Sequence, residues 1–472
     1  MKFTEFQEFQ NVKTLVIGSG ISGVGAVSLL CRFGADIIFY DSNEKLTADE
    51  LQEKLDREFE KETDRPAKVQ PVYCITGEMP VEVEEQVEAA VLSPGVPTDI
   101  PLVNRLRDAG VPILGEIELG FMAEKGCVAA ITGTNGKTTT TTLVGDIMKA
   151  HLGEDKVFVV GNIGNPYTLE VTKTSADSVT VAEISSFQLE TVHKFKPKVS
   201  AILNITPDHL DRHGSMENYI DIKMKVTLTQ SGDEYLILNR ESAYMENVPS
   251  RTKAQIVWFS SVRELNEGCF LRDGEIILRW KDEPETDICT AADLHLIGRF
   301  NYENVMGAVL ITKALGVPND VIRRQVLSFT AVPHRMEFVC KKDGVDYYND
   351  SKGTNPDSTV KALGIMTKPT VLIAGGFDKG ADYTEMVQLF KGRVKHLILL
   401  GETAKAIAAC TDKVCPVPYS FVSTMEEAVQ KAEEVAEPGD TVLLSPACAS
   451  WDMYPNFEVR GEHFKNLVRE EL

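Results

Sequence analysis

The central segment of this chain reads Ile131-Thr132-Gly133-Thr134-Asn135-Gly136-Lys137-Thr138-Thr139-Thr140. An apolar run that begins at Cys127 leads into it, and Leu143, Ile147 and Met148 follow at helical spacing. The segment therefore predicts a buried strand, a glycine-rich loop and a helix. That geometry directs backbone N–H groups and the positive end of a helix at a phosphate.

The loop also carries the side chains that a phosphate site uses. Lys137 can reach the outer phosphates of a nucleotide, and the Thr138 hydroxyl can bind Mg²⁺. The usual phosphate-loop pattern has a glycine five residues before Gly136, where this chain has Ile131. By the strict pattern the loop is a variant, and the alternative is a glycine-rich turn before a threonine-rich helix.

Length and composition limit the class of protein. A chain of 472 residues with 43% hydrophobic residues predicts about three globular domains. A net charge of −21 argues against binding to nucleic acid or to a membrane surface. The nine cysteines are dispersed, which fits reduced thiols, and no apolar signal core or membrane-length run is visible. We therefore expect a cytoplasmic protein, and a monomer.

The amino-terminal region contains a second glycine loop. A strand from Lys13 to Ile17 leads to Gly18-Ser19-Gly20-Ile21-Ser22-Gly23, and a second strand, 36–40, ends at Asp41. This is the dinucleotide fingerprint, which by itself indicates a nicotinamide or flavin enzyme. A UDP-sugar would use the same two features: a glycine loop that a diphosphate can approach closely, and a carboxylate that can form a hydrogen bond with a ribose or a base. Ser93-Pro94-Gly95 is a further turn at a strand end, and a plain turn is the alternative for Ser93.

Strands and helices continue to alternate through the centre of the chain. Apolar runs at 157–160, 178–182 and 199–203 predict a mostly parallel sheet whose loops gather at one edge. Polar groups follow these strands, with Glu183 after one and Asp208 and His209 after another. A lone glutamate at a strand end is usually only solvated. The convergence with the phosphate loop favours Glu183 as a metal ligand.

The carboxyl-terminal third predicts a second doubly wound sheet, with apolar runs at 370–374, 396–400 and 441–444. Polar loops follow its strands, among them Asp350-Ser351-Lys352-Gly353-Thr354-Asn355 and the loop that contains Lys379. A dicarboxylate needs cations and N–H donors, which Lys352 and Lys379 could supply, although either alone reads as a surface lysine. Cys448 is interpreted as a small buried residue.

Three of these motifs resemble the Mur ligases, the ATP-dependent amide-forming enzymes of peptidoglycan precursor synthesis. They are the phosphate loop, Glu183-Ile184-Ser185-Ser186-Phe187-Gln188-Leu189 and Asp208-His209-Leu210-Asp211. The 350–355 loop resembles the D-glutamate-adding branch. The resemblance implies an α/β fold of three domains: a Rossmann-like UDP-sugar domain at 1–115, a P-loop-type ATPase domain at 116–331 and a Rossmann-like amino-acid domain at 332–472. The Ile131 variant of the loop is the family's own form.

The resemblance also assigns residues. It places ATP at Gly133, Thr134, Asn135, Gly136, Lys137, Thr138, Thr139, Asn301, Asn304, Arg335 and Asp350. It places the UDP-sugar at Ile21, Ser22, Asp41, Ser42, Asn43, Ser93, Gly95 and Asn162, and D-glutamate at Lys352, Thr354, Lys379, Ser450 and the backbone of Phe457. Two Mg²⁺ ions are implied, one at Thr138 and Glu183, the other at His209 and Lys223 carrying a carbamate (N6-carboxylysine), with Asp208 in support. Lys225 is the nearby competitor for the carbamate.

The implied reaction joins D-glutamate to UDP-N-acetylmuramoyl-L-alanine through an acyl phosphate, with Lys137, Glu183, His209, Lys223 and Lys352 as the catalytic set. The sequence does not identify the base that removes a proton from the incoming amine. Three rival functions remain open at this stage. They are a dinucleotide oxidoreductase, a nucleotide-binding regulator without catalysis, and a folylpolyglutamate synthase.

Overall fold

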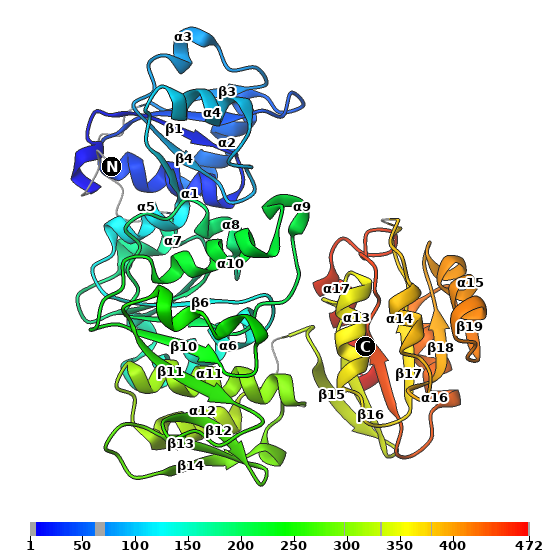
Figure 1. The fold of residues 1–472 in the computed structure, drawn as a ribbon. Helices are drawn as coiled ribbons and strands as arrows, with labels where there is room; N and C mark the ends of the chain where they lie inside the picture. Colours follow the sequence, from blue (N-terminus) through cyan, green and yellow to red (C-terminus); the bar gives the residue numbers. More distant parts are fainter. Residues whose placement is uncertain (1–5, 62–70, 297, 331–332, 379, 471–472) are drawn as a thin grey trace. The chain divides into compact units, whose positions relative to one another are not determined.

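The computed structural model describes residues 6–61, 71–296, 298–330, 333–378 and 380–470. The chain forms two compact units, one of residues 1–293 with 300–327 and one of residues 294–299 with 328–472. The first unit contains two β-sheets and the second contains one (Figure 1). Each sheet is mostly parallel with helices between its strands, as the alternation of apolar runs predicts.

The amino-terminal sheet has five parallel strands in the order β3-β2-β1-β4-β5. Val16 and Phe39 pack on one face against α1 and α2, whereas Leu15 and Ile38 pack on the other against α4. Both faces are therefore covered, which explains the continuous apolar strands. The elements are β1 Lys13–Ile17, α1 Ile21–Arg32, β2 Asp36–Asp41, α2 Ala48–Phe59, β3 Tyr73–Thr76, α3 Val81–Glu84, β4 Ala89–Leu92, α4 Pro101–Asp108, β5 Ile113–Gly115 and α5 Glu116–Ala123.

The central sheet has nine strands in the order β14-β13-β12-β11-β10-β9-β6-β8-β7. Neighbouring strands from β7 through β8, β6, β9, β10 and β11 to β12 are parallel, whereas β12–β13 and β13–β14 are antiparallel pairs. The strands are β6 Cys127–Thr132, β7 Val157–Gly161, β8 Val179–Glu183, β9 Val199–Ile202, β10 Tyr235–Asn239, β11 Gln255–Ser260, β12 Gly268–Arg272, β13 Glu275–Arg279 and β14 Thr286–Thr290. The helices are α6 Lys137–Leu152, α7 Tyr167–Glu170, α8 Ser186–Leu189, α9 Leu210–His213, α10 Met216–Met224, α11 Arg299–Ala314 and α12 Asn319–Ser328.

The carboxyl-terminal sheet has the order β15-β16-β20-β17-β18-β19, parallel except for the β15–β16 hairpin. Leu372 and Leu443 pack against α13, α14 and α15, and Val371 and Val442 pack against α16 and α17. The elements are β15 Glu337–Lys342, β16 Val345–Asn349, α13 Pro356–Ile365, β17 Thr370–Ala374, α14 Thr384–Gln388, β18 Val394–Leu399, α15 Ala404–Val414, β19 Tyr419–Phe421, α16 Met425–Val435, β20 Thr441–Leu444 and α17 Phe457–Arg469.

Local predictions can be compared with these bounds. The strand, loop and helix predicted around residue 131 are present as β6 and α6, and Gly274, with a φ of +85°, lies in the turn between the antiparallel strands β12 and β13. Helix α11 begins at Arg299, directly after Gly298, whose φ of +92° is not a helical conformation. The predicted domain boundary at 115 falls between β5 and α5, and the one at 331 and 332 lies outside the described residues.

Two further features can be stated for the described part of the chain. None of its helices is long and apolar enough to cross a bilayer. The described residues, which include all nine cysteines, form no disulfide bond.

Candidate active site

The phosphate loop joins the buried strand β6 to the amino end of α6. Gly136, the residue before the helix, has a φ of +82°. A Cβ atom there would lie 2.0 Å from Oδ1 of Asn304, so both conformation and space require glycine. No side chain caps the helix, and the first-turn N–H groups of a helix have no intrahelical partner. The loop therefore presents an uncapped positive helix end, which suits an anion.

Asn204, two residues after the end of β9, holds the loop in shape. Its Oδ1 accepts a hydrogen bond from Asn135 N at 2.9 Å, and its Nδ2 donates to Asn135 O at 3.0 Å. Thr134 N donates to Asn204 O at 3.0 Å, and Thr134 Oγ1 pairs with Tyr219. The backbone N–H groups of Thr134 and Asn135 are thus used inside the protein. Asn204 was not predicted as a site residue, although its place after a strand of this edge was a usable signal.

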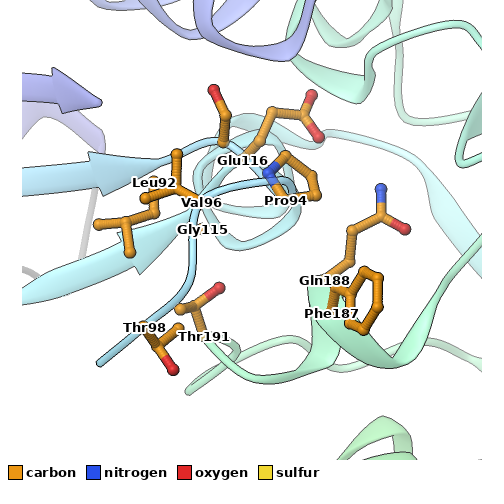
Figure 2. Close-up of a pocket in the computed structure, with 10 residues that line it drawn as sticks. Leu92, Pro94, Val96, Thr98, Gly115, Glu116, Phe187, Gln188 and Thr191 are labelled. Atoms are coloured by element: carbon orange, nitrogen blue, oxygen red, sulfur yellow. The ribbon is translucent and has the colours of Figure 1, made fainter. Parts of the chain in front are cut away.

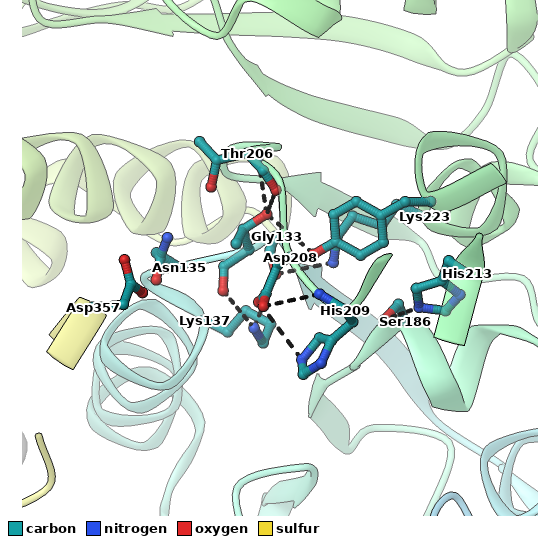
Figure 3. Close-up of polar contacts among 12 residues, drawn as sticks. Gly133, Asn135, Lys137, Ser186, Thr206, Asp208, His209, His213, Lys223 and Asp357 are labelled. Atoms are coloured by element: carbon teal, nitrogen blue, oxygen red, sulfur yellow. Dashed lines mark hydrogen bonds and ion pairs between the residues drawn. The ribbon is translucent and has the colours of Figure 1, made fainter. Parts of the chain in front are cut away.

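Lys137 and Lys223 approach the loop at the same atom. Lys137 Nζ donates to Gly133 O at 2.9 Å and Lys223 Nζ donates to it at 3.0 Å (Figure 3). Lys223 is only 1% exposed. The pKa of Lys223 lies well below its ordinary value. Burial is the main cause and the positive charge of Lys137 adds to it, whereas the negative charge of Asp208 acts in the opposite direction. The competitor Lys225 donates to Glu190 O instead, at 2.7 Å.

Glu183 is the last residue of β8 and is 1% exposed. Its Oε1 accepts a hydrogen bond from Asn162 Nδ2 at 2.6 Å, and its backbone oxygen accepts one from Asn162 N at 2.9 Å. Its Oε2 is buried and has no hydrogen-bond partner among the described residues. A buried carboxylate oxygen without a donor is costly unless a ligand satisfies it.

Asp208 and His209 lie in the loop between β9 and α9. His209 Nε2 is 3.6 Å from Asp208 Oδ2, and the His209 ring packs on Phe187 with 4.8 Å between centroids. The His209 side chain is 49% exposed, so its ring is accessible to a ligand. Figure 3 shows Lys137, Asp208, His209 and Lys223 around the phosphate loop. Lys137, Asp208 and His209 thus follow the adjacent strands β6 and β9, and Lys223 reaches the same loop from α10.

A buried polar network lies behind this loop and was missed from the sequence. His213 Nε2 is 3.0 Å from Ser186 Oγ, and its Nδ1 is 3.5 Å from Glu190 Oε1. Arg212 donates to both oxygens of Glu190, at 3.0 and 2.6 Å, and its guanidinium lies 4.2 Å from the Phe187 ring centroid. Burial lowers the pKa of His213, although Glu190 opposes the shift. The network fixes α8, next to Glu183, to α9, next to His209.

The donor set fits a metal that is bound mainly through a nucleotide. The described residues hold no group of three or more histidine, cysteine or acidic side chains poised to bind a metal. Mg²⁺ usually takes one or two protein carboxylates and completes its octahedron with water and substrate phosphates. The unsatisfied Oε2 of Glu183 and the hydroxyl of Thr138, at the helix end, match that pattern.

In α11, Asn301 and Asn304 lie on one face, and Asn304 Nδ2 donates to Asn301 Oδ1 at 3.3 Å. Both residues are buried, and Asn304 O accepts a hydrogen bond from Thr140 Oγ1 at 3.4 Å. Together with the contact at Gly136, this fixes α11 against the phosphate loop.

The amino-terminal glycine loop is organised by Asp41. Its Oδ2 accepts hydrogen bonds from Ser19 N at 2.8 Å and Ser19 Oγ at 2.6 Å, and its Oδ1 accepts one from Asn43 N at 3.0 Å. Burial raises the pKa of Asp41, but these hydrogen bonds outweigh it and the net pKa is lowered. Of the other predicted residues, Ile21, Ser42, Asn43 and Gly95 are exposed and Ser22 is half-buried.

Ser93 has a structural partner and also lines a pocket. Its hydroxyl donates to Gly18 O at 3.0 Å, which links the strand-end turn to the glycine loop. The pocket lies between residues that follow β4 and β5 and residues of α8 and the segment after it, with Phe187, Gln188 and Thr191 on the α8 side (Figure 2). The predicted sugar-binding turn therefore faces the helix that follows Glu183.

Glu116, another pocket residue, was not predicted. Its Oε1 accepts hydrogen bonds from Thr168 N and Oγ1, both at 2.8 Å, while its buried Oε2 has no hydrogen-bond partner among the described residues. Burial raises its pKa, although the Thr168 contacts oppose this. Its position one residue past a strand end was the available signal.

Asp350 in the second unit is buried. Its Oδ2 accepts a hydrogen bond from Ser445 Oγ at 2.8 Å and its Oδ1 accepts one from Met336 N at 3.2 Å. Burial raises its pKa to about 6, against the lowering influence of Ser445 and Arg335. Arg335 itself is exposed.

The predicted D-glutamate residues follow neighbouring strands of this unit's sheet. Lys352 and Thr354 follow β16, and Ser450, which is 2% exposed, follows β20. Lys352 Nζ lies 5.6 Å from the ring centroid of Phe457, the first residue of α17. Lys379 lies outside the described residues. Cys448 is buried as predicted, with its Sγ 3.2 Å from Thr403 Oγ1.

Comparison with protein-family models gives three matches in chain order. Residues 12–115 match the Mur ligase MurD-like N-terminal domain, residues 131–312 match the Mur ligase middle domain, and residues 334–448 match the Mur ligase glutamate ligase domain. The three matches together span most of the chain.

Curated proteins match over almost the whole length. The UDP-N-acetylmuramoylalanine–D-glutamate ligases of Lachnospira eligens and Lachnoclostridium phytofermentans are each 49% identical to this chain. The alignments cover 98% of this chain and 99% and 98% of the relatives. The ligase of the same name from Clostridioides difficile is 40% identical, over 98% of this chain and 99% of that protein.

Solved structures share the fold at lower identity. The UDP-N-acetylmuramate-alanine ligase of Thermotoga maritima aligns with a TM-score of 0.57 at 17% identity, over 98% of this chain and 100% of that one. A MurF structure from Acinetobacter baumannii aligns with a TM-score of 0.59 at 15% identity, over 97% and 93%. With its phosphate loop, its three α/β domains and these full-length matches, the chain belongs to the Mur ligase family.

Proposed function

We propose that this protein is an ATP-dependent ligase that adds D-glutamate to UDP-N-acetylmuramoyl-L-alanine in peptidoglycan precursor synthesis. The observation that carries this proposal is the near-complete alignment, at 40–49% identity, with ligases named for that reaction. The geometry supports the same chemistry, because an uncapped helix end, Lys137 and a buried, unsatisfied Glu183 oxygen belong to one sheet edge.

In this proposal the central domain binds the triphosphate. The end of α6 and Lys137 neutralise phosphate charge, and α11 meets the adenine through Asn301 and Asn304. Mg²⁺ supplies charge neutralisation when bound, one ion at Thr138 and Glu183 and a second at His209 and a carbamate on Lys223. The burial of Lys223 and the oxygen it shares with Lys137 support the carbamate, since modification would turn one of two crowded cations into an anion.

The other two substrates occupy the outer domains. The diphosphate of the UDP-sugar approaches the Gly18–Gly23 loop, with Ile21, Ser22, Asp41, Ser42, Asn43, Ser93 and Gly95 around it, and Asn162 orients the acceptor. Lys352, Thr354, Lys379, Ser450 and the Phe457 backbone hold the carboxylates of D-glutamate. Arg335 and Asp350 contact ATP. The domains span residues 1–115, 116–331 and 332–472.

The reaction then has two steps. A carboxylate oxygen of the L-alanyl group attacks the γ-phosphorus of ATP, which forms an acyl phosphate and releases ADP. The neutral amine of D-glutamate attacks the acyl carbon, and the tetrahedral intermediate collapses to the amide with loss of inorganic phosphate. The amine gives up one proton in this step. Since both ATP and a nucleotide-linked sugar are consumed, we place the enzyme in the cytoplasm, and we propose that it acts as a monomer.

The test is phosphate release with UDP-N-acetylmuramoyl-L-alanine and ATP, with D-glutamate compared against L-glutamate, L-alanine and L-lysine. Stoichiometric phosphate release and a new amide only with D-glutamate support the proposal. ATP binding without phosphate release would instead indicate a nucleotide-binding regulator. NAD(P)H binding in a fluorescence titration would support an oxidoreductase.

A further inference from the structure

Arg460 is a buried cation that none of the roles above uses. It lies in the first turn of α17 and is 3% exposed. Its Nε donates to Ser351 Oγ at 3.0 Å and its Nη2 to Ser351 O at 2.9 Å. Nη1 and Nη2 also donate to Cys448 O, at 3.2 and 3.1 Å. The rigid fork of the guanidinium therefore ties the loop after β16 to the loop after β20.

The same group is linked to the other segments of the predicted D-glutamate site. Ser351 Oγ, which accepts from Arg460, donates in turn to Phe457 O at 2.9 Å. A Cβ atom on Gly376, in the loop after β17, would lie 3.3 Å from Arg460 Nη1 and 2.3 Å from Ala449 O. Since β16, β20 and β17 are adjacent parallel strands, all three loops leave the same edge of the sheet. Arg460 donates hydrogen bonds to two of these loops and lies beside Gly376 of the third.

The charge of Arg460 is not balanced by a close carboxylate. Among the described residues its hydrogen-bond acceptors are two carbonyl oxygens and a hydroxyl, and Asp452 and Asp350 act on it through their charge alone. Burial lowers its pKa to about 10, so it stays charged at neutral pH. An apolar side chain would fill such a volume without the desolvation cost of a buried cation, so packing alone does not account for it.

We propose that Arg460 is a positioning residue for D-glutamate. It sets the loops that carry Lys352, Ser450 and Phe457, and it adds a fixed positive charge beneath the place where the dicarboxylate binds. This inference rests on the proposed D-glutamate site. Arg460 does not touch the substrate and acts through Ser351 and Cys448.

The test compares two variants. Arg460→Met keeps a long side chain but removes the charge, and Arg460→Lys keeps the charge but removes the planar guanidinium group with its several N–H donors. We expect Arg460→Met to raise the KM for D-glutamate about tenfold or more, as loss of charged hydrogen bonds does. The KM values for ATP and for UDP-N-acetylmuramoyl-L-alanine should stay within about twofold of the parent, and Arg460→Lys should recover part of the loss.

Two outcomes would overturn the inference. One is an unchanged KM for D-glutamate in Arg460→Met, and the other is an equal rise in all three KM values, which a general loss of structure produces. If Arg460→Met does not fold, Ser351→Ala cuts the link to Phe457 while keeping the guanidinium, and the same selective rise is expected.

A Ser450→Ala variant separates this inference from the proposed function. If Ser450→Ala raises the KM for D-glutamate and the Arg460 and Ser351 variants do not, only the role of Arg460 fails. If none of these variants affects D-glutamate, the site assignment fails and the inference with it.

Discussion

The ammonium groups of Lys137 and Lys223 donate to one carbonyl oxygen, that of Gly133, at 2.9 and 3.0 Å. Two cations at a single acceptor repel each other, and the burial of Lys223 strengthens that repulsion. The arrangement is relieved when a triphosphate draws Lys137 away or when Lys223 becomes an anion. Both events belong to the proposed reaction, which makes this pair the most informative place to test it.

Replacement of Lys223 by alanine should abolish activity, because the proposed carbamate is lost. Addition of a short-chain carboxylate should restore part of it by filling the space of the carbamate. Phosphate release with and without the additive is the measurement. Lys225→Ala is the matched control, since Lys225 donates to Glu190 O and not to the phosphate loop. A fully active Lys223→Ala enzyme would remove the carbamate from the scheme.

Lys137→Ala should reduce kcat by about 10²–10³-fold, the usual cost of losing one group that stabilises developing charge. The protein should remain folded, because Lys137 is half-buried and donates to carbonyl oxygens of its own loop, those of Gly133 and Thr134. Steady-state kinetics together with circular dichroism distinguish the two effects. Near-normal turnover would contradict the role given to the loop.

Gly136→Ala should damage both ATP binding and stability. The backbone at φ +82° costs an alanine about 1–3 kcal/mol, and its Cβ would meet Asn304 Oδ1 at 2.0 Å. Thermal melting and titration with an ATP analogue measure the two losses. Gly232→Ala is the control, because a Cβ there meets no atom within 4 Å. Equal behaviour of the two variants would contradict the packing described here.

Asn162→Ala removes the amide proposed to orient the acceptor, which also donates to Glu183 Oε1, and should raise the KM for the UDP-sugar about tenfold, the usual effect of losing one hydrogen bond to a charged group. Asn165→Ala, three residues away, removes only a hydrogen bond from an exposed side chain to Val159 O and should have little effect. Substrate titrations at saturating ATP provide the comparison. If both variants behave alike, Asn162 has no part in orienting the acceptor.

The buried Asp350 predicts a pH dependence of stability. Its pKa rises from 3.8 to about 6 on folding, so the folded state binds the proton more tightly. Stability from this group is therefore greatest in acid and falls as the pH rises from about 4 to about 6. A shift of about two units corresponds to about 3 kcal/mol.

The Asp350→Asn variant keeps the shape of the side chain but has no carboxyl group to ionise. Relative to the parent, the variant should gain stability as the pH rises through that window, and calorimetric melting at several pH values measures the difference. Parallel curves for the two proteins would show that Asp350 has the same pKa folded and unfolded.

The sequence by itself determined the order of strands and helices and the edge at which polar groups gather. Those features depend on local periodicity and on glycine loops at strand ends, as at Gly133–Gly136 and Gly18–Gly23. It also gave Glu183 and Lys137 as chemical candidates, since each belongs to a short motif.

Only the tertiary structure decided which partners those groups have. Three hydrogen bonds, from Asn135 to Asn204, from Asn162 to Oε1 of Glu183 and from Arg460 to Ser351, join residues that are 69, 21 and 109 positions apart. Burial and hydrogen-bond partners of this kind arise when strands pack side by side. No local pattern encodes them, because the physical interaction depends on distance in space and not on distance along the chain.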